Sequence, residues 1–228
     1  MSSPTGSRTW SWRTSTGPRS SRSTTARTLC STATHRVGYE DYYLVNTIDR
    51  EALVDLGGYD VVVDYTTDST LTDTQREGLL SFVAEGGGYA GVHCGADLTT
   101  LDPGPDAAEN MVSRDDPFPQ LREMLGGHYV THPDATAMDV NVVDSYHPIT
   151  ADIGDFTVWD EPYHVDYDDD VRVLARMDHP ELGDMPVVWV TDYGEGDVFY
   201  CSLGHDRASL TNDGTQALVG AGVYWAGT

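Results

Sequence analysis

The sequence predicts an α/β fold, with a parallel sheet that carries helices on both faces and a strand-rich antiparallel extension. Three observations support this prediction. Apolar runs typical of buried parallel strands alternate with amphipathic helical segments in the first half of the chain. The second half is rich in short strand-like segments. The chain of 228 residues has no internal repeat, so one α/β domain is the simplest account of it.

Strand and helix signals alternate from Tyr39 to the middle of the chain. In the clearest helix, Thr72 and Gln75 form a capping box at the start, and Gly86 ends the apolar stripe. The run YDVVVDYT is apolar without alternation, as expected for a strand that is buried on both faces. The predicted elements are a strand at 42–47, a short helix at 50–60 closed by glycine, a strand at 59–66, a helix at 71–88 and a strand at 88–93.

The second half predicts the antiparallel extension and the last helical layer. Several short segments there look like strands, and they add an antiparallel extension to the parallel sheet. The predicted elements are a short helix at 118–127, strands at 137–144, 156–165, 171–177, 186–193 and 196–204, and a closing helix at 215–227. The absence of an interior linker in this part favours one continuous domain.

The charge of the chain argues against two classes of partner. It has 37 acidic residues, 13 basic residues that are all arginine, and a formal net charge of −24. Such a surface repels nucleic acid and anionic membranes, and no apolar window approaches the length of a membrane span. Dense carboxylates without lysine indicate a halophile's cytoplasm, where salt screens their mutual repulsion. Three widely spaced cysteines, Cys30, Cys94 and Cys201, fit neither a disulfide framework nor a zinc ribbon, and agree with a reducing cytoplasm.

The first part of the chain differs sharply from the rest in composition. Residues 1–39 hold six arginines and no acidic residue, whereas residues 40–228 hold all 37 acidic residues. This part is rich in serine, threonine and arginine, lacks the apolar core of a signal peptide, and shows no convincing strand before residue 40. It fits a disordered basic tail, a targeting segment, or a stretch read from a wrong frame or start, and we prefer the last. The predicted organisation is therefore a basic segment at 1–38 and a folded domain at 39–228.

The stretch GGGYAGVHCGAD, residues 86–97, carries the strongest local signal for a functional site. Its GVHCG core has the glycine spacing of a nucleophile elbow, a sharp turn after a strand that lifts the middle residue. The middle residue is His93, and Cys94 comes one place later, so its thiol would point elsewhere. A cysteine-dependent amidotransferase or protease needs the thiol at the elbow. We therefore predict that the protein is not a cysteine-dependent glutaminase.

Several other polar side chains follow the ends of predicted strands, which is where parallel α/β sheets bind their ligands. General acid–base chemistry by His93, His205 and Glu161 requires only reach and suitable protonation. A metal site would draw on His93, His128 or His132, His205 and Glu161, although no tight motif such as H-E-x-x-H supports it. The predicted residues are His93, His205 and Glu161 for catalysis, Tyr65, His128, His132, Asp160 and Tyr163 for substrate binding, and His93, His128 and His205 for a divalent metal such as zinc.

Five short segments follow one another between about residues 57 and 227: GGGYAGVHCGAD, LREMLGGHYVTHPD, HPITADIGDFTVWDEPYHVDYDDDVRVLA, PVVWVTDYGEGDVFYCSLGHD and ALVGAGVYWAG. In this order they resemble the ThuA-like, or trehalose utilisation, family. The resemblance implies a flavodoxin-like, class I glutamine amidotransferase-like sheet. It also aligns the family's histidines with His93, His128, His132 and His205, and its acid with Glu161.

The resemblance further implies a role in sugar catabolism, beside a dehydrogenase that oxidises trehalose and related disaccharides. An oxidised (3-keto) disaccharide is then the expected substrate, because an acid–base pair next to the ketone would enolise it and drive elimination or isomerisation. A metal would help to polarise the ketone. The alternative is a non-catalytic sugar-binding or partner domain for the dehydrogenase. The expected partners are a small sugar and that dehydrogenase, without nucleic acid or membrane. The sequence leaves open whether the chain forms a homo-oligomer.

Overall fold

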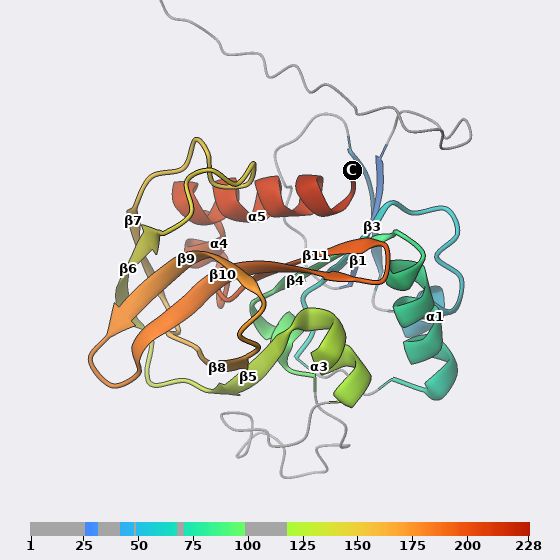
Figure 1. Ribbon diagram of the computed structural model, residues 1–228, viewed down its shortest axis with the longest axis horizontal. Coiled ribbons are helices and arrows are strands. Elements are labelled where there is room, and N and C mark those ends of the chain that lie inside the picture. Colours follow the sequence, from blue (N-terminus) through green and yellow to red (C-terminus); the bar gives the residue numbers. More distant parts are fainter. Residues whose placement is uncertain (1–25, 32–41, 48, 68–70, 99–117) are drawn as a thin grey trace, which may run out of the picture.

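The computed structural model describes residues 26–31, 42–47, 49–67, 71–98 and 118–228 (Figure 1). The strands are β1 (Ala26–Ser31), β2 (Tyr42–Thr47), β3 (Val61–Asp64), β4 (Gly88–Val92), β5 (Gly127–Thr131), β6 (Thr136–Val142), β7 (Phe156–Asp160), β8 (His164–Tyr167), β9 (Arg172–His179), β10 (Gly183–Tyr193) and β11 (Gly196–Cys201). The helices are α1 (Asp73–Ala84), α3 (Pro119–Leu125), α4 (Arg207–Leu210) and α5 (Asp213–Ala226), with 3-10 helices η1 (Arg50–Val54) and η2 (His93–Ala96).

One mixed sheet organises the molecule. Within the described residues its strand order is β2-β1-β3-β4-β11-β10-β9-β6-β7. The strands from β2 to β11 pair in parallel, and those from β11 to β7 pair antiparallel. A separate antiparallel pair, β5 and β8, lies beside this sheet (Figure 1). The predicted parallel sheet with an antiparallel extension is confirmed.

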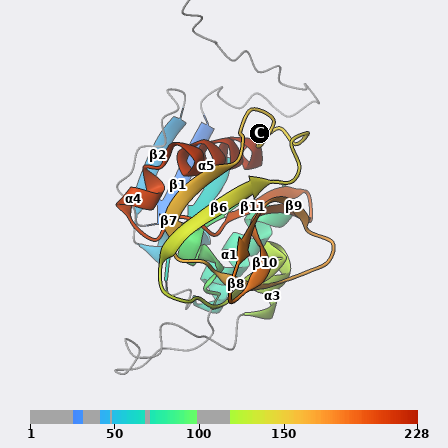
Figure 2. The same cartoon turned by 90° about the vertical axis from the view of Figure 1, so that its left-hand side faces the viewer.

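Helices cover both faces of the parallel half, as predicted. Figures 1 and 2 show α5 on one side of the sheet and α1 with α3 on the other. Alternate residues of β3 enter the two layers: Val61 and Val63 join the core that contains Leu218 of α5, and Val62 joins the core that contains Leu121 of α3. Burial of successive side chains on opposite faces explains why this strand is apolar throughout.

The predicted helix start at Thr72 is confirmed in atomic detail. The Thr72 hydroxyl accepts a hydrogen bond from the Gln75 backbone N–H, and the Gln75 side chain accepts one from the Thr72 N–H. Gly86 has φ 98°, a left-handed conformation that favours glycine just after a helix. The local sequence therefore determines both ends of α1. Among the described residues, none of the helices has the length and apolarity needed to cross a bilayer.

Two predictions about strands are wrong. The segment 156–165 is not one strand, because β7 ends at Asp160 and β8 begins at His164, in a different sheet. Pro162 lies in the break and has no N–H to continue a ladder. The strand β5 was not predicted; its pairing with β8 across the chain is a long-range contact.

A strand also precedes residue 40, where none was predicted. Residues 26–31 form β1, which pairs in parallel with β2 on one side and β3 on the other. Backbone hydrogen bonding from both neighbours compensates for a sequence without apolar periodicity. Residues 1–25 and 32–41 lie outside the described residues, so the predicted division at 38 stays a prediction.

Candidate functional site

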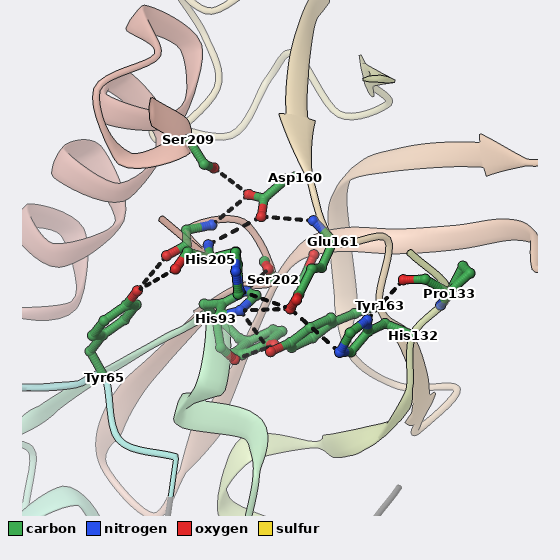
Figure 3. A network of polar contacts seen from close by, with 12 residues as sticks. Tyr65, His93, His132, Pro133, Asp160, Glu161, Tyr163, Ser202, His205 and Ser209 are labelled. Atoms are coloured by element: carbon green, nitrogen blue, oxygen red, sulfur yellow. Dashed lines mark hydrogen bonds and ion pairs between the residues drawn. The ribbon is translucent and has the colours of Figure 1, made fainter. Parts of the chain in front are cut away.

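Three neighbouring parallel strands end at one edge of the sheet and supply the first part of the site. Tyr65 follows β3, His93 follows β4, and His205 comes shortly after β11. The registers Asp64↔Gly91 and Cys201↔Val92 align these ends. Figure 3 shows the three side chains gathered there with Glu161. The predicted convergence of strand-end residues is therefore present for Tyr65, His93 and His205.

The turn after β4 presents His93 through an unusual backbone. Among the described residues, His93 is the non-glycine residue with a positive φ, at 48°. Such strain is stored preferentially at functional sites. The turn also needs Gly95, because a Cβ there would lie 2.6 Å from the Asp64 carbonyl oxygen. The side chain it presents is buried, with His93 only 4% exposed.

Hydrogen bonds define the tautomer of His93. Its Nδ1 lies 2.8 Å from the carbonyl oxygen of Ser202, which can only accept, so Nδ1 carries the proton. In the neutral ring Nε2 then holds a lone pair, and the Tyr163 hydroxyl lies 2.8 Å from it. Burial, with neighbouring tyrosines and acidic groups, raises the pKa of Tyr163 well above its ordinary value, so its hydroxyl stays protonated and donates to Nε2.

Glu161 lies at the centre of the site, in the break between β7 and β8. Its Oε2 is 3.1 Å from His205 Nδ1, 3.4 Å from His93 Nε2 and 3.5 Å from His132 Nε2. Burial alone would raise the pKa of Glu161, but the imidazoles of His93, His132 and His205 around the carboxylate lower it below its ordinary value. The carboxylate is therefore charged at neutral pH, and it attracts any proton or cation that the three rings hold.

The three imidazoles differ in their access to solvent. The side chain of His205 is 50% exposed, whereas that of His132 is 19% exposed and His93 is buried. The carboxylate facing His205 Nδ1 favours the tautomer with a proton on that nitrogen, which leaves Nε2 as the free base. His132, at the end of β5, directs its own Nδ1 to the Pro133 carbonyl oxygen at 2.8 Å. His205 is thus the member of the group that can meet a ligand directly.

The buried carboxylate of Asp160 connects the segments that carry the site residues. Its carboxylate accepts from the backbone N–H groups of Gly204 at 2.7 Å, His205 at 3.1 Å and Glu161 at 2.9 Å, and from the Ser209 hydroxyl. It is 1% exposed. These four donors occupy the carboxylate, which indicates that Asp160 positions His205 and Glu161; the predicted contact with substrate stays a prediction.

Tyr65 supports the same turn from the opposite side. Its hydroxyl donates to the carbonyl oxygens of Gly204 and His205, at 2.5 and 3.4 Å (Figure 3). Burial, and then the nearby Cys94 and carboxylates, raise the pKa of Tyr65 to about 12, so the donor keeps its proton at neutral pH. Tyr65 therefore fixes the backbone on which His205 is mounted, in addition to any contact with substrate.

His128 lies apart from this group. It belongs to β5, and its Nδ1 is 3.7 Å from Asp166 Oδ2 on β8. Burial lowers the pKa of His128, against the opposing effect of Asp166. Among the described residues, the group whose ligand atoms all lie within 4.8 Å of one another, and so could hold a metal ion, is His93, Glu161 and His205. The sequence predicted His128 as the third metal ligand beside His93 and His205, whereas in the structure Glu161 is the third member of the group.

Cys94 is buried next to His93 within η2. Burial raises the pKa of its thiol to about 12, although a hydrogen bond with Thr67 acts in the opposite direction. The thiolate is the reactive form of cysteine, so a thiol with this pKa is a poor nucleophile at neutral pH. Burial and the raised pKa agree with the prediction that Cys94 is not a catalytic nucleophile, which stays a prediction.

Two contributors were missed by sequence reasoning. Ser202 acts through its backbone carbonyl, so no side-chain motif could reveal it. Ser209 lies in α4, whose start is capped by the Asp206 side chain accepting from the Ser209 N–H at 2.9 Å. An Asp three residues before a Ser is a weak capping signal that could have marked this short helix.

The sheet and its polar carboxyl edge define a class I glutamine amidotransferase-like α/β protein, with histidines and a carboxylate where a cysteine nucleophile would be expected. The sequence model of the family described as ThuA, trehalose utilisation, matches residues 20–226. The chain belongs to this family.

Solved structures agree with that fold. A ThuA-like protein from Bacteroides uniformis ATCC 8492 is 19% identical, with a TM-score of 0.67 over 92% of this chain and 95% of that one. A ThuA-like protein from Parabacteroides merdae ATCC 43184 is 20% identical, with a TM-score of 0.65 over 90% of each chain. A β-galactosidase from Rahnella sp. R3 is 15% identical, with a TM-score of 0.59 over 88% of this chain and 30% of that one. None of the curated proteins compared with the chain matches it.

Proposed function

We propose that the protein is an enzyme of carbohydrate catabolism that acts on an oxidised (3-keto) disaccharide, such as a trehalose derivative. The single observation that carries this proposal is the pair formed by Glu161 and His205. The carboxylate lies 3.1 Å from His205 Nδ1, and the His205 ring is half exposed at the carboxyl edge of the sheet. A largely shielded carboxylate behind an accessible imidazole is the arrangement by which proteins build a general base. Membership of the trehalose utilisation family supports the sugar as substrate.

The chemistry of a keto sugar suits such a base. His205 Nε2 would take the proton from the carbon next to the ketone, and the electrons of that C–H bond would move toward the carbonyl oxygen to form an enolate. Glu161 would stabilise the imidazolium that results. In an isomerisation, the hydroxyl proton on the deprotonated carbon would pass to the enolate oxygen, and the proton held by His205 would return to the former carbonyl carbon, so that the ketone moves to the next carbon. Loss of the group on the next carbon, with the proton passing to that leaving group, completes an elimination.

His93 has a supporting role in this scheme. Both of its ring nitrogens are engaged inside the protein, by Ser202 and by Tyr163. Its Nε2 is also 3.4 Å from Glu161 Oε2, and because this nitrogen carries no proton in the neutral ring, the two atoms attract each other only when a proton or a cation lies between them. His132 adds a second ring on another side of the same oxygen. We propose that these rings position Glu161 and that Tyr65, His128, His132 and Tyr163 complete the surroundings of the sugar.

A divalent metal such as zinc gives a second form of the same function, favoured by the close spacing of His93, Glu161 and His205. Two imidazoles and a carboxylate are a ligand set that catalytic zinc accepts, and the Ser202 carbonyl orients the His93 ring as an outer-shell partner should. When bound there, such an ion would polarise the ketone oxygen. His205 Nδ1 would then be a ligand and carry no proton, so the two forms exclude each other.

We further propose that the protein works in the cytoplasm beside a sugar dehydrogenase that supplies the keto sugar. The expected absence of nucleic acid and anionic membrane as partners rests on the net charge of −24. Cys94 and Cys201 are free and buried, as expected for a reducing compartment. The rival hypothesis is a sugar-binding or partner domain without turnover.

The test is turnover of 3-keto-trehalose by the wild-type protein and by His205→Asn and Glu161→Gln. We expect a loss of about 100-fold or more in kcat for His205→Asn, which is the usual contribution of a general base. His179→Asn, at the β9–β10 hairpin, is the matched control and should retain activity. Chelation with EDTA separates the two forms, because only the metal-assisted form is inactivated. Binding of the sugar without turnover by the wild type would favour the rival and overturn the enzymatic proposal.

A further inference from the structure

Two different partners, a metal ion and a hydroxyl proton, would compete for the lone pair on His93 Nε2. The Ser202 carbonyl fixes the proton on Nδ1, so Nε2 is the atom through which the neutral ring can bind a cation. This nitrogen lies 3.4 Å from Glu161 Oε2, inside the group of His93, Glu161 and His205 that could hold a metal. The Tyr163 hydroxyl lies 2.8 Å from it and donates a hydrogen bond to the same lone pair. A metal and the hydroxyl proton therefore cannot use it together.

The structure holds the Tyr163 hydroxyl firmly in this position. Tyr163 is 5% exposed, its ring packs on Tyr129 with centroids 4.5 Å apart, and it lies 4.4 Å from the His93 ring. It is also joined to Glu161 through Pro162, whose ring restricts the backbone between them. The short segment from Glu161 to Tyr163 thus carries two groups with opposite effects on a metal. Glu161 is a prospective metal ligand, and the Tyr163 hydroxyl occupies His93, the ligand next to it.

We propose that Tyr163 is a competing donor that controls metal binding at His93, Glu161 and His205. A divalent transition metal enters only when the Tyr163 hydroxyl releases His93 Nε2. The competition selects for ions that bind imidazole strongly, such as Zn²⁺ and Co²⁺, over Mg²⁺ and Ca²⁺, which prefer oxygen ligands. The inference rests on the metal-capable group of the proposed function, but it concerns binding of the ion and not turnover of a sugar.

The first experiment measures binding of Zn²⁺ alone to chelator-stripped full-length protein by isothermal titration calorimetry. Tyr163→Phe keeps the ring and removes the hydroxyl, so we expect a Kd about fivefold lower than that of the wild type, the value of one net hydrogen bond. Tyr129→Phe removes a hydroxyl from the adjacent buried tyrosine and is the matched control, with an unchanged Kd. An unchanged or higher Kd for Tyr163→Phe would overturn the proposal, as would an absence of binding in both proteins.

The second experiment identifies the ligands with Co²⁺ alone, whose visible spectrum reports coordination by nitrogen and carboxylate. We expect His93→Gln and Glu161→Gln to weaken Co²⁺ binding strongly, and His128→Asn to leave the spectrum and the affinity unchanged. Loss of the spectrum in His128→Asn with retention in Glu161→Gln would overturn the ligand set and support the one predicted from sequence.

A third measurement uses the wild-type protein and so does not depend on whether a Tyr163 variant folds. Release of a buried tyrosine hydroxyl from its acceptor changes its near-ultraviolet absorption, so Zn²⁺ should produce a tyrosine difference spectrum in the wild type that saturates with the calorimetric titration. Binding without such a spectrum would contradict the competition. These titrations contain no sugar, so a protein that binds Zn²⁺ in this way but turns over no keto sugar would leave this inference standing while the proposed function fails.

Discussion

At the scale of single residues, backbone carbonyls decide what the imidazoles can do. Ser202 and Pro133 accept from the Nδ1 atoms of His93 and His132, so both rings turn Nε2 toward Glu161. The direction of these lone pairs is a consequence of main-chain geometry, because the carbonyls offer no proton. The reactivity of Cys94 is likewise determined locally, by the surroundings of its sulfur atom.

The predicted behaviour of Cys94 follows from its raised pKa. A thiol whose pKa is raised from 9.0 to about 12 carries roughly a thousandfold less thiolate at pH 8 than a free cysteine. In a Cys30→Ser, Cys201→Ser background, we expect alkylation of Cys94 by iodoacetamide to be slower by about that factor. The rate should keep rising above pH 10, where that of a free cysteine has levelled off. Measured by mass spectrometry, rapid labelling with a plateau by pH 9 would contradict the prediction, and labelling in urea serves as the control.

At the scale of elements, Asp160 joins three segments that are far apart in the sequence. It is the last residue of β7, it accepts from the turn after β11 through Gly204 and His205, and it accepts from α4 through Ser209. The two working residues, His205 and Glu161, therefore share one buried anchor. Their relative position is set by this carboxylate more than by either of their own side chains.

Replacing Asp160 tests this anchor. Asp160→Asn puts an NH₂ donor where donors already converge, so we expect the free energy of unfolding to fall by about 2 to 3 kcal/mol, the cost of unsatisfied buried groups. Activity on the keto sugar should fall with it. Asp139→Asn makes the same charge change at an exposed acid on β6 that accepts from Thr157, and should cost about 0.5 kcal/mol or less. Equal urea midpoints for the two variants would show that Asp160 is no anchor.

The elements themselves were largely predictable. The capping box at Thr72 and the apolar run of β3 are local signals, and both appear in the structure as expected. The break after Asp160 and the strand β5 were not foreseen, because a short alternating pattern does not reveal which sheet a strand will join. The unforeseen break is also the place where Glu161 enters the site, so the pairing of β5 with β8 and the surroundings of Glu161 both depend on a chain crossing that no local pattern shows.

At the scale of the whole molecule, charge is the dominant property. The net charge of −24 gives long-range repulsion that opposes the compact state at low salt. The Debye length falls from about 10 Å at 0.1 M salt to about 3 Å at 1 M, so molar salt removes most of this repulsion. The proposed halophilic origin predicts a protein whose stability depends on that screening.

We therefore expect the midpoint of thermal unfolding to rise between 0.1 M and 2 M KCl, with most of the increase complete by about 1 M. Circular dichroism at several salt concentrations measures it. Sucrose at matched water activity is the control, because it lowers the water activity as KCl does but does not screen charges. A rise of the same size in sucrose, or no rise in KCl, would contradict an electrostatic origin.

The sequence by itself determined the fold class, the ends of helix α1 and the edge of the sheet where the chemistry gathers. These are consequences of local periodicity, capping and the shared direction of parallel strands, each of which is written within a few residues. Tertiary structure alone decided that Glu161 stands among three imidazoles, that His128 stands aside with Asp166, and that the Tyr163 hydroxyl occupies His93. These contacts depend on how the chain crosses from β7 to β8, and long-range packing sets that crossing.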